Sequence, residues 1–159
     1  MVFIKRIVKG DFKKPGGFTL TELMIAVLII GILGAISNLI FQSFVEKARV
    51  KKAVSEIMSL QTKIKAYTLH DGILPDSLAD IEGGTMQDPW GNPYQYINFD
   101  NVPSGLWRKD RNLVPINTDY DLFSMGKDGE TKSPLTAKVS YDDIIRANDG
   151  QYVGRASEY

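Results

Sequence analysis

Four acidic residues near the end of the chain have the type and spacing that suit a bound cation. Asp128 and Glu130 lie in the run G-K-D-G-E over 126–130, and Asp142 and Asp143 follow in the same polar stretch. Ca²⁺ accepts about six to eight carboxylate and carbonyl oxygens in irregular geometry. The D-x-D-x-D-G run of an EF-hand is missing. The residues alone therefore leave two interpretations open, a calcium site and a solvated acidic loop.

A second chemically notable residue is a lone carboxylate near the N-terminus. Glu22 is the only charged residue between Lys14 and Glu46, and apolar residues follow it almost unbroken over Leu23–Ile36. Together with the apolar residues just beyond Asn38, this stretch is about as long as the 17–25 residues that a helix needs to cross the hydrocarbon core. A carboxylate in such a segment is costly in lipid, so we expect Glu22 to have a function.

The remaining composition argues against catalysis. The chain has no cysteine, so it forms no disulfide and no thiolate metal site. Its one histidine, His70, falls at the expected end of a helix, where a partly positive side chain suits the helix dipole. No cue pairs a serine or tyrosine with a base, and no phosphate-binding G-x-x-x-x-G-K-[ST] run occurs. We therefore expect that the protein is not an enzyme.

Charge is distributed unevenly along the chain, although the formal net charge is zero. Residues 1–17 hold five basic residues and one acid, so the remainder carries 14 basic and 18 acidic residues and a net charge of −4. The basic groups of Arg108, Lys109 and Arg111 are expected to lie in a solvated loop. No basic footprint for nucleic acid is left.

The basic residues before the apolar segment suit a membrane-targeting leader. Three interpretations compete: an uncut signal anchor, an ordinary signal peptide, and a leader that is cut at Gly17, before the apolar segment. An ordinary signal peptide is cut after its apolar region, whereas here the small residues Gly16 and Gly17 precede it. By the positive-inside rule the basic end stays in the cytoplasm.

The run G-F-T-L-T-E-L over 17–23 resembles the class III signal of the type IV pilin and pseudopilin superfamily. The resemblance implies that a prepilin peptidase cuts after Gly17 and methylates Phe18, the new N-terminal residue. It also implies that Glu22 pairs with the Phe18 ammonium of a neighbouring subunit in a filament. Many relatives have proline at the position of Leu39. Without it, a continuous helix is the expectation through residues 34–39.

The elements that follow predict an α+β fold: a long N-terminal α-helix, with a transmembrane first half, packed on a small antiparallel sheet. We divide the chain into a leader (1–17), a transmembrane and filament-core segment (18–44), an amphipathic half of the same helix (45–70) and a periplasmic α+β domain (71–159). Apolar residues recur at helical spacing over 50–67.

Within the domain, the sequence predicts a short helix over 74–81 with its cap near Asp76 and a rigid turn over 88–94. Strands are expected over 94–99 and 120–125, and residues 106–107 and 113–116 are expected to contribute a weaker one. Near the C-terminus, Asn148-Asp149-Gly150 reads as a turn and 152–154 as an edge strand.

Three blocks of the domain resemble the major pseudopilin of type II secretion systems. They are D-P-W-G-N-P-Y-Q-Y at 88–96, Y-D-L-F-S-M-G-K-D-G at 120–129 and D-D-I at 142–144. We interpret the first block as architecture, with Trp90 in the core. The resemblance implies a structural Ca²⁺ held by the main-chain oxygen of Met125 and by Asp128, Asp142 and Asp143. The span between Asp128 and Asp142 is longer than is usual in that family. Whether Glu130 also binds the ion stays open.

The resemblance implies a structural subunit that polymerises into a periplasmic pseudopilus for type II protein secretion. Its expected partners are copies of itself, the prepilin peptidase, minor pseudopilins and an inner-membrane assembly platform. Before assembly the chain would cross the bacterial inner membrane once, with its C-terminal domain in the periplasm. No nucleic-acid partner is expected.

Two alternatives remain. A type IV pilus subunit, major or minor, would serve adhesion, motility or DNA uptake, but the two C-terminal cysteines common in such pilins are missing. A signal-anchored periplasmic enzyme or ligand-binding module would require that Gly17 is not cut and that a pocket lies near Trp90 and Trp107.

Overall fold

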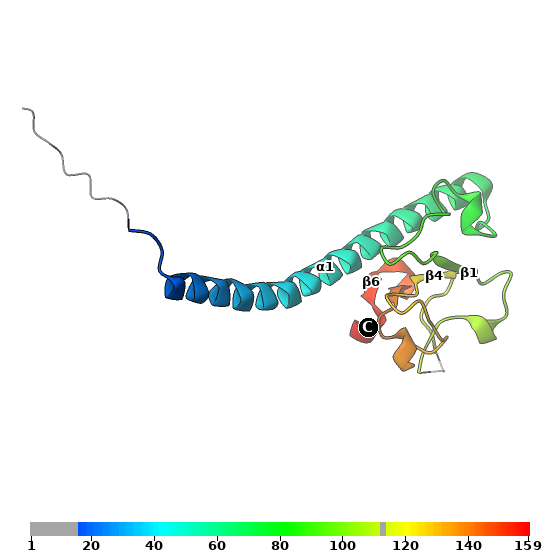
Figure 1. The fold of residues 1–159 in the computed structure, drawn as a ribbon. Coiled ribbons are helices and arrows are strands. Elements are labelled where there is room, and N and C mark those ends of the chain that lie inside the picture. Colours follow the sequence, from blue (N-terminus) through cyan, green and yellow to red (C-terminus); the bar gives the residue numbers. More distant parts are fainter. Residues whose placement is uncertain (1–15, 112–113) are drawn as a thin grey trace, which may run out of the picture. The chain divides into compact units, whose positions relative to one another are not determined.

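The computed structural model describes residues 16–111 and 114–159, apart from the side chain of Leu39. The chain divides into two compact units, of which the first ends at Gln42 and the second runs from Ser43 to Tyr159. Figure 1 shows a single long helix and the small sheet-containing domain of the second unit.

The first element, α1, is an uninterrupted α-helix over Leu20–Asp71. The expected continuity through residues 34–39 is confirmed. The polar side chain of Ser37 is satisfied inside the helix, because its hydroxyl donates to the carbonyl oxygen of Leu33 at 2.7 Å. The helix ends before Gly72, whose φ of +78° is a left-handed conformation that favours glycine at a helix C-terminus.

The C-terminal half of α1 buries one face against the sheet of its own domain. Its buried residues recur at spacings of three and four, which is the period of an α-helix; they are Ala53, Ile57, Leu60 and Ile64. They share one hydrophobic cluster with Leu122 and Ile144 from the sheet. The predicted amphipathic stripe is therefore confirmed as a packing surface.

Four antiparallel strands form the main sheet in the order β1-β4-β5-β6. Their bounds are Gln95–Asn98 for β1, Tyr120–Ser124 for β4, Ile144–Ala147 for β5 and Tyr152–Arg155 for β6. A second, two-stranded sheet pairs β2 (Lys109–Asp110) with β3 (Val114–Pro115). A helix on an antiparallel sheet is the α+β arrangement that the sequence predicts.

The central strand β4 has a hydrophobic cluster on each face. Leu122 packs in the cluster under α1, whereas Phe123 packs in a second cluster with Ile145. Phe123 and Ile145 are also direct partners across β4 and β5. Because successive side chains of a strand point to opposite faces, both faces of β4 are covered. This explains why all five of its residues are buried.

The predicted short helix over 74–81 is shorter than expected. Only Leu78–Asp80 is helical, as one 3₁₀ turn, and its cap is Ser77 and not Asp76. The Ser77 hydroxyl accepts from the amide of Ala79 at 3.2 Å, and the Asp80 carboxylate accepts from the amide of Ser77 at 2.8 Å. These reciprocal bonds make a capping box.

The other strand predictions differ in their accuracy. The strand predicted over 120–125 is confirmed as β4, and the edge strand at 152–154 is confirmed as β6. Residues 106–107 belong to no strand. Strand β3 begins at Val114, and Leu113 lies outside the described residues. Strand β5 was not predicted.

Candidate functional site

The predicted processing site lies just before α1. Gly17 and Phe18 belong to a segment without regular structure, and the Phe18 side chain is 90% exposed. A Cβ atom added at Gly17 would have no heavy-atom neighbour within 4 Å. The described part of the chain therefore gives no packing reason for a glycine at this position.

Glu22 caps the helix to which it belongs. Its carboxylate Oε2 accepts from the backbone amide of Thr19 at 2.9 Å and from the Thr19 hydroxyl at 2.8 Å. In return, the amide of Glu22 donates to the Thr19 hydroxyl at 3.2 Å. This capping box was not predicted, although its signal, T-x-x-E before an apolar run, is present at 19–22.

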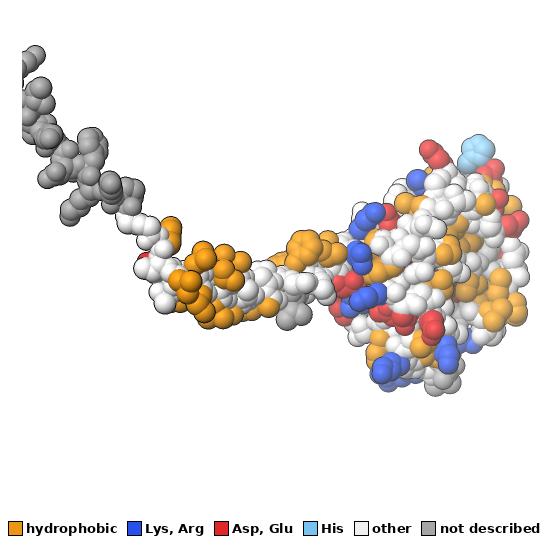
Figure 2. Space-filling view, in the orientation of Figure 1, with side chains coloured by type: hydrophobic (Ala, Val, Ile, Leu, Met, Phe, Trp, Pro, Cys, Tyr) orange, Lys and Arg blue, Asp and Glu red, His pale blue; other side chains and the backbone are white. Residues whose placement is uncertain are grey.

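The first part of α1 exposes an apolar surface all round. The exposed side chains are Leu23, Met24, Ile25, Val27, Leu28, Ile29, Ile30, Ile32, Leu33, Ile36, Ile40 and Phe41. Figure 2 shows hydrophobic side chains gathered on this part of the helix. Among the described residues, α1 is the one helix long and apolar enough to cross a membrane. An apolar helix of this kind needs lipid or other apolar helices around it.

The acidic loop between β4 and β5 is organised by Asp142. Its Oδ2 atom accepts from the backbone amides of Lys127 at 2.8 Å and Asp128 at 3.1 Å. The Asp128 carboxylate accepts in turn from the amide of Glu130 at 2.9 Å. Asp142 and Asp128, predicted from opposite ends of the loop, are thus brought together on the turn that follows Met125.

Asp143 points elsewhere. It is fully buried, and its Oδ2 atom accepts from Nη2 of Arg108 at 2.5 Å and from the hydroxyl of Thr131 at 2.7 Å. Burial raises the pKa of the Asp143 carboxyl to about 6, although the Arg108 guanidinium opposes that rise. At neutral pH the carboxylate is ionised and forms a buried ion pair with Arg108.

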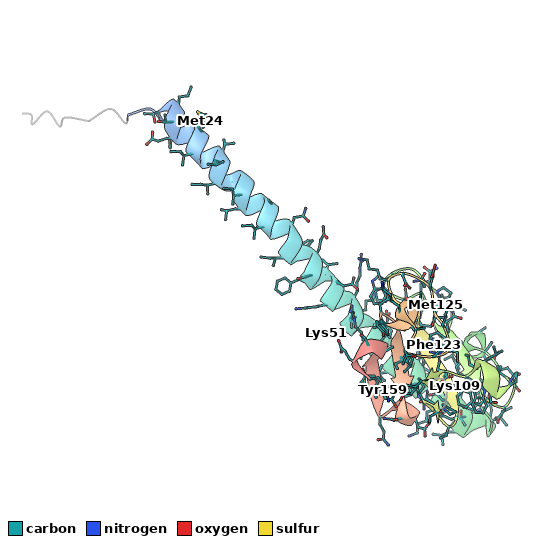
Figure 3. The ribbon with its side chains drawn as sticks, turned by 90° about the horizontal axis from the view of Figure 1, so that it is seen from below. Met24, Lys51, Lys109, Phe123, Met125 and Tyr159 are labelled. Atoms are coloured by element: carbon teal, nitrogen blue, oxygen red, sulfur yellow. The ribbon has the colours of Figure 1, made fainter. Side chains whose placement is uncertain are left out.

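The expectation that Arg108 is a solvated loop residue is wrong. Its side chain is only 2% exposed, and its guanidinium carbon lies 4.4 Å from the centroid of the Phe123 ring. Figure 3 shows Phe123 in the domain, between Met125 and Lys109 in that view. The burial of Arg108 could not be predicted from neighbouring residues, because its ion-pair partner, Asp143, is 35 residues away in the sequence. The neighbouring Arg111 side chain is 82% exposed, as expected.

The predicted calcium ligands fit an ion only in part. Asp128 and Asp142 share one turn, but Asp143 is already paired with a guanidinium. In the described residues, no group of three or more acidic, histidine or cysteine side chains is placed to hold a metal. The set of Met125, Asp128, Asp142 and Asp143 remains a prediction, and the donor chemistry at Asp143 counts against it.

The D-P-W-G-N-P-Y block holds this loop to the sheet. The Asp88 carboxylate accepts from the amides of Trp90 and Asn92 and from the Ser124 hydroxyl at the end of β4. The Asn92 side chain donates to the carbonyl oxygen of Gly126 at 2.9 Å. These polar side chains form bonds inside the domain, which supports the interpretation of the block as architecture.

Both indole groups are also engaged within the domain. Trp90 donates from Nε1 to the Glu46 carboxylate at 3.3 Å and packs beside the core under α1. Trp107 stacks on Phe99 with ring centroids 4.0 Å apart, and its Nε1 donates to the carbonyl oxygen of Val102. This arrangement gives no support to a ligand pocket lined by the two tryptophans.

The C-terminal run completes the sheet and returns to the helix. The predicted turn at Asn148–Gly150 is confirmed and leads into the edge strand β6. At the end of β6, Nη2 of Arg155 donates to Glu46 at 3.3 Å. Glu46 therefore receives bonds from both the tryptophan block and the C-terminal strand.

Gly126 is the residue of the acidic loop where a side chain would be most disruptive. Its φ is +66°, and an added Cβ would lie 2.6 Å from the main-chain oxygen of Asp142 and 2.7 Å from its Oδ2. We expect Gly126→Ala to lower the free energy of unfolding by about 2–4 kcal/mol, from backbone strain and the displaced Asp142. Urea unfolding of the detergent-solubilised full chain, followed by tryptophan fluorescence, measures the loss.

Gly72→Ala is the matched control for this prediction. Gly72 has a similar φ of +78°, but an added Cβ would meet no heavy atom within 4 Å. Gly72→Ala should lower the free energy of unfolding by only about 1 kcal/mol, from backbone strain alone. Equal losses in the two variants would show that the contact with Asp142 does not matter.

Two family models match the sequence. The model described as "Prokaryotic N-terminal methylation motif" matches residues 12–37, and the model described as "Type II secretion system (T2SS), protein G" matches residues 40–140. The first match covers Gly17, Phe18 and Glu22. The second covers the C-terminal half of α1 and most of the domain.

Similar proteins carry corresponding names. The chain is 32% identical to the type II secretion system core protein G of Aeromonas hydrophila, over 74% of this chain and 87% of the relative. It is 31% identical to the protein of the same name from Vibrio cholerae, over 74% and 84% of the two chains. It is also 27% identical to the type IV major pilin protein PilE of Neisseria gonorrhoeae, over 85% and 86%. No solved structure matches the chain significantly.

Proposed function

Because the chain belongs to the type II secretion system protein G family, we propose that it is the major structural subunit of a pseudopilus that drives type II protein secretion. The single observation that carries this proposal is the protein G match over residues 40–140, which covers the C-terminal half of α1 and most of the domain. Members of this family are structural components of a secretion machine. We therefore assign the chain no catalytic activity.

The exposed apolar part of α1 explains how such a subunit would work. An apolar helix with no cover of its own is stable in lipid and also in a bundle of identical helices. Transfer of the subunit from the bilayer into the filament exchanges one apolar environment for the other. The filament would then grow by addition of subunits, assisted by minor pseudopilins and an inner-membrane assembly platform.

The charge pattern supports an orientation for the membrane-bound form. Basic residues are concentrated in the leader, on the N-terminal side of the apolar segment. By the positive-inside rule this side stays in the cytoplasm and the C-terminal domain lies in the periplasm. Prepilin peptidase would then cut after Gly17 and methylate Phe18 on the cytoplasmic side.

The competing proposal is a type IV pilus subunit, and the similarity to gonococcal PilE is the observation that favours it. That relative is less similar than the two named protein G relatives. The protein G match also covers most of the domain, beyond the N-terminal methylation motif. We therefore place secretion first.

Deletion of the gene tests the proposal in the bacterium that carries it. We expect exoproteins to accumulate in the periplasm and to disappear from the medium, and a plasmid copy to restore their release. Surface pili, adhesion and DNA uptake should be unchanged. Normal release of exoproteins with a loss of pili would contradict the proposal and favour the type IV pilin.

A further inference from the structure

Arg108 lies at a junction of four segments of the domain. Its backbone amide donates to Oδ2 of Asp121 in β4 at 2.6 Å. Its Nη1 atom donates to the hydroxyl of Thr131 and to the carbonyl oxygen of Lys132. Its Nη2 atom donates to Asp143, directly before β5. One buried side chain thus joins the segment before β2, the acidic loop and the start of β5.

Two carboxylates are buried at this place, and one of them makes a positive charge necessary. Asp143 is 0% exposed and Asp121 is 1% exposed. Asp121 is satisfied by neutral donors, the amide of Arg108 and the side-chain amide of Asn117 at 2.9 Å. Asp143 has one charged partner, the Arg108 guanidinium. A buried carboxylate without a cation would be strongly destabilising.

We propose that Arg108 is the built-in cation of the acidic loop, and that this chain folds and keeps the loop in place without calcium. The Arg108 guanidinium compensates Asp143 and ties the loop to the sheet, which is the role that the sequence analysis gave to a Ca²⁺ ion. This inference stands apart from the proposed function, since a secretion subunit could hold its loop by either means.

The donor chemistry explains why the guanidinium and an ion exclude each other. A Ca²⁺ ion needs about six to eight oxygen ligands. At Asp143 the Oδ2 atom already accepts two hydrogen bonds, and a guanidinium at 2.5 Å would repel a divalent cation. The Oδ2 atom of Asp142 likewise accepts two backbone amides. One oxygen of each of these two carboxylates thus already accepts protein donors. Oδ1 of Asp143 is buried without a hydrogen-bond partner among the described residues, but it belongs to the carboxylate that the guanidinium already neutralises.

The first test measures the response of the unaltered chain to calcium. The full chain in detergent micelles is melted in a chelator and in a series of CaCl₂ concentrations, with tryptophan fluorescence as the signal. If Arg108 fills this role, the midpoint does not change. Calcium bound only to the folded state would raise it by roughly 5–10 °C at a hundredfold excess over its dissociation constant. Such a rise, reversed by the chelator, would overturn the proposal.

The second test removes the charge. Arg108→Gln should lower the melting midpoint by roughly 10–20 °C, because it leaves the Asp143 carboxylate buried without a cation. Arg111→Gln is the matched control. It removes the same charge from an exposed side chain that lies three residues after Arg108 in the sequence. The control should melt like the unaltered chain. A normal midpoint for Arg108→Gln would overturn the proposal.

Three further variants decide the case if Arg108→Gln does not fold. Arg108→Met combined with Asp143→Asn removes both charges, and this double variant should melt higher than Arg108→Met alone. Arg108→Lys retains the charge, and it should fold and melt without a calcium response. A double variant less stable than the single one, or an Arg108→Lys chain that needs calcium to fold, would contradict the assigned role.

Discussion

A chain that carries Gly17→Leu is expected to accumulate as an uncut precursor and to form no filament. By the family pattern, the prepilin peptidase would cut after Gly17, and a large side chain there would block the cut. The structure offers no competing explanation for such a loss, because a Cβ atom added at Gly17 would meet nothing within 4 Å in the described chain. The domain should therefore fold normally in this variant.

Gly16→Ala is the matched control for Gly17→Leu, since a Cβ at Gly16 also meets no neighbour within 4 Å. It should be cut and assembled normally. Immunoblots of membrane fractions separate precursor from mature chain, and mass spectrometry of the N-terminus detects methylated Phe18. A mature, methylated N-terminus at residue 18 in the Gly17→Leu chain would refute the assigned cleavage site.

Loss of the Glu22 charge is expected to abolish assembly while cleavage proceeds. In a filament, a buried Glu22 carboxylate would pair with the Phe18 ammonium of a neighbour, which offsets the cost of burying both charges. In the single chain the same carboxylate caps its helix by accepting bonds from Thr19. An alanine substitution removes both interactions and cannot tell them apart.

Glu22→Gln separates the two roles. Glutamine can accept the capping bonds of Thr19, but it carries no charge. If the charge drives assembly, Glu22→Gln and Glu22→Ala should both be cut normally and both yield less than about a tenth of the filaments, a loss that corresponds to about 1.4 kcal/mol or more. Sheared filament fractions from cells that overproduce the subunit give the yield. Normal filaments from Glu22→Gln would show that the cap, and not the charge, matters.

Regular patterns made much of the fold predictable. The apolar stripe of α1 recurs at helical spacing, and Ala53, Ile57, Leu60 and Ile64 are buried accordingly. Strand β4 was predictable from its run of large apolar and aromatic residues. The D-P-W-G-N-P-Y turn was predictable because proline fixes its own φ angle, whereas glycine can adopt the positive φ angles that many turns require. In each case the signal lies within a few neighbouring residues.

The missed features depend on contacts between distant residues. Strand β5 contains Arg146, and a charged residue in a short strand argues against a buried position. The structure buries it nevertheless, because Asp119 pairs with its guanidinium at 2.7 and 2.8 Å and the Tyr120 ring lies 3.9 Å from its guanidinium carbon. Arg108 was missed for the same reason. A charged side chain is predicted to be exposed to solvent when its ion-pair partner is unknown.

The candidate site shows the same limit. The residue types of Asp128, Asp142 and Asp143 suggested oxygen ligands for a cation. The sequence could not show what each carboxylate accepts from. In the structure Asp142 accepts backbone amides, whereas Asp143 accepts a guanidinium. The choice between metal and arginine depends on the three-dimensional path of a loop.

The double attachment of Glu46 has a mechanical consequence. Its carboxylate receives the Trp90 indole and the Arg155 guanidinium, which come from segments 65 residues apart in the chain. Tension applied along α1 would thus be divided at this point between two routes into the sheet, one through the tryptophan turn and one through the C-terminal strand. Both bonds would have to rupture before the helix could peel from the domain at Glu46. A subunit that is pulled repeatedly by its helix would gain resistance to unzipping from this arrangement.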